Sequence, residues 1–120
     1  MKVYVAGTWD FSKPAKRLID RLVSLGHFAH DWTDHRSLTN TLEYAMSDEK
    51  AVRECDMFVI TSPETISRGK FTEFGMALAL HKPIVVLGDA TQLGIFGHLN
   101  RHVIAKSEDD VIKIVESRAI

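Results

Sequence analysis

The chain has 120 residues, a formal net charge of −1 and 45% hydrophobic residues, which predicts one globular domain over residues 1–120 and argues against disorder. This charge provides no basic field for a nucleic-acid polymer. The lone Cys55 excludes a disulfide within the chain, and no apolar run approaches the ~20 residues that span a bilayer. We therefore expect a cytoplasmic protein that contacts neither nucleic-acid polymers nor membranes.

Short apolar runs alternate with amphipathic stretches along the chain. Residues 2–7 form a β-branched run that ends in glycine, which is typical of a buried strand. Four more strands are predicted at residues 27–32, 56–62, 82–89 and 101–106. Apolar residues recur with helical spacing over residues 15–26, 41–55, 107–118 and the segment that follows Gly69, while residues 90–100 are predicted to be a glycine-rich loop.

This alternation of strands and helices favours a parallel sheet that is covered on both faces. The sequence therefore predicts an α/β fold of the doubly wound, flavodoxin-like (Rossmann-like) type, with three layers and a five-stranded parallel sheet. In such folds the ligand binds beyond the carboxyl ends of the strands. The candidate site segments are residues 7–13, 32–40, 61–73 and 88–100.

Candidate binding residues follow the first strand directly. Gly7 allows a close approach of the backbone to a ligand, the Thr8 hydroxyl can bind phosphate or sugar, and the Trp9 indole offers a stacking face. An ordinary turn with a partly buried tryptophan would have the same sequence. Neither a G-x-G-x-x-G fingerprint nor a phosphate-binding loop of the G-x-x-x-x-G-K type is present.

Two carboxylates are candidates for catalytic residues. Glu73 lies near the start of a predicted helix, where the helix dipole and backbone N–H groups would lower its pKa and favour an ionised nucleophile. Acidic residues at helix starts also occur for stability alone. Asp48 lies eight residues before Asp56, at the entry to the third strand, and a solvated helix face is its alternative reading. The six histidines and one cysteine form no zinc signature, so no metal or other cofactor is predicted.

Three segments together resemble the nucleoside 2-deoxyribosyltransferase superfamily, which includes the 2′-deoxynucleoside 5′-phosphate N-hydrolases. The segments are "VYVAGTW" from residue 3, "SDEKAVRECDMFVI" from residue 47 and "SRGKFTEFGMALALHKPIVVL" from residue 67. The third carries the most specific pattern, in which a glycine, three residues, a glutamate, a hydrophobic residue and a glycine follow one another.

The resemblance implies roles for residues of all three segments. It implies that Glu73 attacks the anomeric carbon of a nucleoside, that Asp48 orients Glu73 or relays a proton, and that Tyr4 forms a hydrogen bond with the same carboxylate. It also implies that Gly7, Thr8 and Trp9 contact sugar and base.

One position bears on the substrate. Six residues before the nucleophile, transferases of free nucleosides carry aspartate and the monophosphate hydrolases carry serine, and this chain has Ser67. A hydroxyl beside Arg68 and Gly69 can bind a phosphate that a carboxylate would repel. We therefore predict an N-glycosidase acting on a nucleoside 5′-monophosphate, with 2′-deoxyribose as the expected sugar. The alternatives are a transferase that moves deoxyribose between bases and a non-catalytic nucleotide-binding module. The resemblance and the apolar segments at residues 74–80 and 94–99 also predict a homodimer or larger homo-oligomer.

Overall fold

A computed structural model describes residues 1–34, 41–61 and 67–118 of the chain. In these ranges five parallel strands form one sheet in the order β2-β1-β3-β4-β5, which is the strand order of flavodoxin-like folds. The predicted fold class is therefore confirmed. The strands are β1 (Lys2–Ala6), β2 (Phe28–Ala29), β3 (Met57–Thr61), β4 (Ile84–Leu87) and β5 (His102–Ala105).

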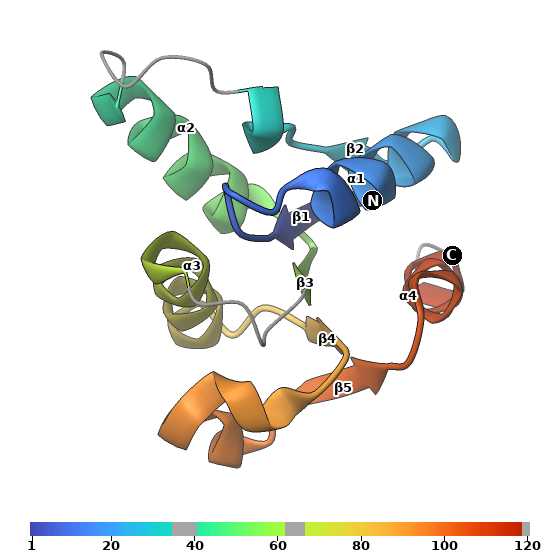
Figure 1. Ribbon diagram of the computed structural model, residues 1–120. Coiled ribbons are helices and arrows are strands. Elements are labelled where there is room, and N and C mark those ends of the chain that lie inside the picture. Colours follow the sequence, from blue (N-terminus) through green and yellow to red (C-terminus); the bar gives the residue numbers. More distant parts are fainter. Residues whose placement is uncertain (35–40, 62–66, 119–120) are drawn as a thin grey trace.

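Helices cover both faces of the sheet, two on each (Figure 1). On one face lie α1 (Lys13–Ser24) and α4 (Glu108–Arg118), and on the other lie α2 (Thr41–Glu54) and α3 (Arg68–Ala79). The first pair is joined by ion pairs from Arg21 to Glu108 and Asp109, at 3.0 and 2.9 Å. The α2–α3 pair stands over β1 and β3, and these two helices carry Asp48 and Glu73.

Local sequence explains where the helices begin and end. The hydroxyl of Ser67 accepts a hydrogen bond from the backbone N–H of Lys70 and caps α3, and Ser107 caps α4 through the N–H of Asp110. Helix α1 ends before Gly26, whose φ of 91° lies in the left-handed region that favours glycine. Ser12 precedes α1, but its side chain forms no capping bond within the described residues.

The middle of the sheet is the core of the protein. All five residues of β3 are buried, and the inner residues of β1 are at most 2% exposed. Tyr4 of β1 is in register with Phe58 of β3, and their rings stack with centroids 5.8 Å apart. This stacking fixes the Tyr4 ring beneath the α2–α3 face, with its hydroxyl directed away from the strand.

The segment between β4 and β5 differs from the predicted loop. It forms a 3-10 helix, η3 (Ala90–Leu99), which is interrupted at Gly94, where φ is 71°. The side chain of Asp89 accepts a hydrogen bond from the Thr91 N–H at 2.9 Å and caps the first turn. Gly94 therefore interrupts a helical segment rather than preventing one. A second short 3-10 helix, η1 (Trp32–Asp34), follows β2.

None of the helices in the described part of the chain is both long enough and apolar enough to cross a membrane.

Candidate active site

A hydrogen bond between two chain segments 69 residues apart defines the site. The Tyr4 hydroxyl, from the middle of β1, donates to Oε2 of Glu73 in the second turn of α3. Tyr4 is 1% exposed, and burial together with the charges of Glu73 and Asp48 raises its pKa. Tyr4 therefore keeps its proton and acts as a hydrogen-bond donor held in place, which fixes the direction of one carboxylate oxygen of Glu73.

The electrostatics of Glu73 differ from the sequence prediction. The helix dipole was expected to lower its pKa, but burial raises the pKa of the Glu73 carboxyl to about 7. The Tyr4 hydrogen bond lowers this pKa, the charge of Asp48 raises it, and the charge of His30 lowers it. The prediction was wrong because burial, the largest cause of the shift, outweighs the effect of the helix start and cannot be read from the sequence.

Asp48 lies on the inner side of α2 and is joined to a residue that the sequence analysis did not select. Its Oδ1 accepts a hydrogen bond from Nε2 of His30 at 2.9 Å, and the two side chains are 24% and 21% exposed. The His30 ring stacks on Tyr4 with centroids 6.3 Å apart. Asp48 is thus half-buried and paired, and the solvated-face alternative does not describe it.

The residues after β1 form a tight turn at the carboxyl end of the strand. A Cβ atom on Gly7 would lie 2.9 Å from Oγ1 of Thr61, so only glycine fits there without displacement. Thr8 is half-buried, and its carbonyl accepts from the Phe11 N–H at 3.1 Å. Trp9 is 52% exposed and lies 6.4 Å from the ring of Trp32. The structure therefore leaves the Trp9 face accessible, whereas Gly7 has a packing role of its own.

The predicted phosphate residues lie at the start of α3, one turn before Glu73. Ser67 is the N-cap, and because its oxygen accepts from the Lys70 N–H at 3.3 Å, its own O–H remains a donor. Arg68 and Gly69 begin the helix and are exposed. Lys70, which the sequence analysis passed over, is 1% exposed, with Nζ 5.1 Å from the centre of the Phe71 ring.

The structure thus brings Tyr4, Asp48 and Glu73 together and adds His30. Ser67 precedes the helix that carries Glu73, and the turn after β1 follows the strand that carries Tyr4. A half-buried carboxyl with a pKa near neutrality beside a second carboxylate is suited to proton transfer and to nucleophilic attack at one carbon. Within the described residues, no group of three or more histidine, cysteine, aspartate or glutamate side chains is placed to hold a metal ion.

Comparison with known proteins gives one family and two similar solved structures. Residues 3–108 match the family model of nucleoside 2-deoxyribosyltransferases, and no curated protein matches significantly. The fold is similar to that of the CMP N-glycosidase BcmB of Clostridium botulinum, with 21% identity, a TM-score of 0.66, and coverage of 97% of this chain and 99% of the other.

It is also similar to the 2-deoxyribosyltransferase of Bacillus psychrosaccharolyticus, with 17% identity, a TM-score of 0.72, and coverage of 92% of this chain and 90% of the other. At these identities the two structures support the fold, and the family rests on the match over residues 3–108. Because that match covers most of the chain, the protein belongs to the nucleoside 2-deoxyribosyltransferase family and is an enzyme that cleaves or transfers N-glycosidic bonds.

Proposed function

We propose that the protein hydrolyses the N-glycosidic bond of a nucleoside 5′-monophosphate, with 2′-deoxyribose as the sugar and Glu73 as the nucleophile. The observation that carries this proposal is the half-buried carboxylate of Glu73, held by the Tyr4 hydroxyl and influenced by the charge of Asp48. A site that only binds an anionic nucleotide would gain nothing from two carboxylates. A glycosidase uses both, one for covalent attack and one for proton transfer.

The reaction has two steps. In the first, a Glu73 oxygen forms a bond to C1′ while the C1′–N bond breaks, and the base leaves with the electron pair and takes a proton that the Asp48 carboxylate relays from solvent. In the second, water attacks C1′, Asp48 relays the proton of that water to solvent, and the Glu73 carboxylate is released. Tyr4 occupies Oε2 throughout, which directs the other oxygen of Glu73 toward the sugar.

The phosphate is assigned to the start of α3. Ser67 offers an O–H donor, and the first N–H groups and the dipole of the helix favour an anion there. Arg68 is exposed at the same helix start and can add a charged donor. The name of the similar CMP N-glycosidase describes a nucleoside monophosphate as substrate, which agrees with this assignment.

The test is base release from a panel of nucleosides and their 5′-monophosphates, followed chromatographically with and without a second free base. We expect release without the second base and loss of activity in Glu73→Gln. The matched control is Glu49→Gln, which alters an exposed glutamate of α2 whose side chain is 57% exposed. A requirement for the second base would make the protein a transferase. Unchanged release by Glu73→Gln would contradict the covalent mechanism.

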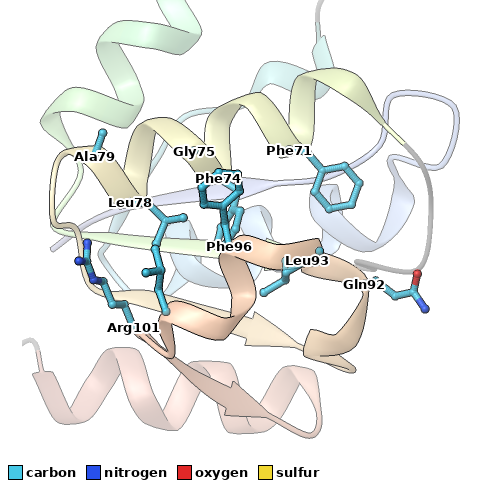
Figure 2. A pocket seen from close by; sticks show the side chains of 11 residues that line it. Phe71, Phe74, Gly75, Leu78, Ala79, Gln92, Leu93, Phe96 and Arg101 are labelled. Atoms are coloured by element: carbon cyan, nitrogen blue, oxygen red, sulfur yellow. The ribbon is translucent and has the colours of Figure 1, made fainter.

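We further propose that the protein assembles as a homodimer through the surface between α3 and η3. A groove with a volume of about 570 Å3 opens there, lined by Phe71 and Phe74 of α3 and by Leu93 and Phe96 of η3 (Figure 2). Phe96 is 60% exposed, and the adjacent Ile95 is 76% exposed.

A second copy of the chain fits this surface because groove and protruding side chains occur on the same face. A two-fold axis brings the same patch of both subunits together, so each copy can insert its exposed η3 side chains into the groove of the other. The edge strand β5, which follows η3 in the chain, carries two further exposed apolar residues, Val103 and Ile104. An apolar surface of this kind is typical of a protein–protein contact.

A further inference from the structure

His30 connects the outer strand of the sheet to the site. It follows β2 directly, and its Nε2 lies 2.9 Å from Oδ1 of Asp48 and 3.4 Å from Oγ of Ser47, both on α2. On its other side the ring stacks against Tyr4, with centroids 6.3 Å apart and planes at 18°. Two rigid elements therefore hold the imidazole, and the imidazole in turn holds the carboxylate of Asp48.

The charges around His30 are mostly acidic. Asp48 faces His30 from α2, and Tyr4 faces it from β1. The charge of His30 also lowers the pKa of Glu73 on α3. The neighbouring Asp31 forms an ion pair with Lys16 of α1 at 2.6 Å, so that carboxylate has a cation of its own. His30 can therefore place a positive charge next to the Asp48 carboxylate.

We propose that His30 is a positioning residue, which orients Asp48 for proton transfer and, when protonated, offsets its charge so that Glu73 is ionised for attack. This inference rests on the proposed function for the roles of Asp48 and Glu73. Two contributions are separable, because orientation requires only a hydrogen-bond donor at the place of Nε2, whereas the charge requires the imidazolium. Variants that keep the donor but not the charge can therefore test the two contributions separately.

The test compares His30→Gln and His30→Ala in the full-length protein. Glutamine carries an N–H donor at the end of its side chain but no charge, whereas alanine supplies neither. We expect His30→Ala to lower kcat by about tenfold to a hundredfold with a smaller change in KM, because a displaced proton-transfer group slows the chemical step. His30→Gln should recover part of kcat, yet both variants should move the acidic limb of the kcat/KM profile to higher pH, since the charge of His30 lowers the pKa of Glu73.

The matched control is His27→Gln. His27 lies at the other end of β2, is 8% exposed and forms its ion pair with Glu116 of α4 at 3.0 Å, away from the site. This variant should alter thermal stability and leave the pH profile unchanged. An additional His30→Ala change in an Asp48→Asn background should lower kcat by a much smaller factor than it does in the wild type, because His30 acts through Asp48. Profiles of the His30 variants that match the control, or full additivity with Asp48→Asn, would overturn the proposal.

A second measurement does not depend on turnover. Carbon-13 NMR of the Glu73 carboxyl, assigned by its loss in Glu73→Gln, gives the midpoint of its titration in folded protein. The midpoint should rise in His30→Gln relative to wild type and to His27→Gln. A shift without any base release by the wild type would contradict the proposed function and leave the coupling of His30 to Glu73 intact. An unchanged midpoint in folded His30→Gln would overturn the charge role even if the enzyme is active.

Discussion

The hydroxyl of Tyr4 donates a hydrogen bond to Oε2 of Glu73 and so joins the middle of the sheet to the helix that carries the proposed nucleophile. The tyrosine cannot move, because its ring stacks on Phe58 in the neighbouring strand and is 1% exposed. The carboxylate that it holds is therefore positioned before any substrate arrives. This preorganisation is the structural basis of the predictions on catalysis.

Tyr4→Phe tests the hydrogen bond while keeping the ring in the core. A hydrogen bond to a charged group contributes about 1.5–3 kcal/mol, so we expect kcat/KM to fall by about tenfold or more. The acidic limb of the pH profile should move to higher pH, because the Tyr4 hydrogen bond lowers the pKa of Glu73. Tyr44→Phe, which removes the hydroxyl of the other tyrosine, on α2, is the control. Equal kinetics in both variants would contradict the role of Tyr4.

The raised pKa of Glu73 also predicts a pH-dependent stability. The pKa is 4.5 in the unfolded reference and about 7 in the folded protein. Between these values the unfolded chain loses a proton that the folded protein retains, so unfolding becomes easier as the pH rises through this window. Above pH 7 the ionised Glu73 lowers the free energy of unfolding by its full amount, and below pH 4.5 it does not lower it.

Glu73→Gln removes this cost and should raise the free energy of unfolding by about 1–3 kcal/mol at pH 8, with little difference at pH 4.5. Urea unfolding of wild type and variant at the two pH values measures it, with Glu49→Gln as the exposed control. A Glu73→Gln variant that is less stable than wild type at pH 8 would show that the carboxylate is better solvated than its burial indicates.

Gly7→Ala tests the packing of the turn after β1. The added Cβ would lie 2.9 Å from Oγ1 of Thr61, 3.0 Å from Cβ of Ala15 and 3.1 Å from the Trp32 ring. Forcing a methyl group into such a site costs about 1–3 kcal/mol of stability. Gly69→Ala is the matched control, because nothing lies within 4 Å of its added Cβ and alanine favours the helix by up to ~1 kcal/mol. Thermal unfolding should therefore move in opposite directions in the two variants.

The proposed dimer predicts a specific effect of charge on η3. Phe96→Glu should convert the dimer into a monomer at micromolar concentration, because a carboxylate would be buried at the interface. Phe28→Glu is the control, since Phe28 is 64% exposed on β2 at the opposite edge of the sheet. Light scattering of the three proteins gives the masses. A monomeric wild type would contradict the proposed assembly, and a dimer that Phe96→Glu leaves intact would place its interface elsewhere.

Much of the fold could be predicted from the sequence because its local signals agree with one another. The apolar run of β3 is buried throughout, and Ser67 and Ser107 cap their helices. The η3 segment was missed because its glycines are typical of a loop. Its helical turns depend on the Asp89 cap and on the positive φ of Gly94, which composition does not reveal.

Some residues of the site could be predicted from the sequence, and others could not. Tyr4, Asp48 and Glu73 could be named because each lies in a segment with a recognisable pattern. His30 could not, because its contact with Asp48 joins the residue after β2 to α2 in the folded chain and follows no spacing rule. The direction of the shift in the Glu73 pKa could not be predicted from the sequence either. Burial by distant segments outweighs the helix dipole, and burial is a property of the folded chain.

The last prediction concerns the phosphate and rests on the N-cap of α3. Ser67→Asp should keep the cap, because aspartate accepts the Lys70 N–H as well as serine does, but it places a negative charge where the proposal puts the phosphate. We expect wild type to use a nucleoside 5′-monophosphate at least about tenfold better in kcat/KM than the free nucleoside, since a charge-assisted hydrogen bond contributes about 1.5–3 kcal/mol. Ser67→Asp should reverse this preference. Ser107→Asp, the same change at the cap of α4, should preserve it. Equal use of nucleoside and monophosphate by the wild type would contradict the monophosphate assignment and indicate an enzyme that acts on free nucleosides.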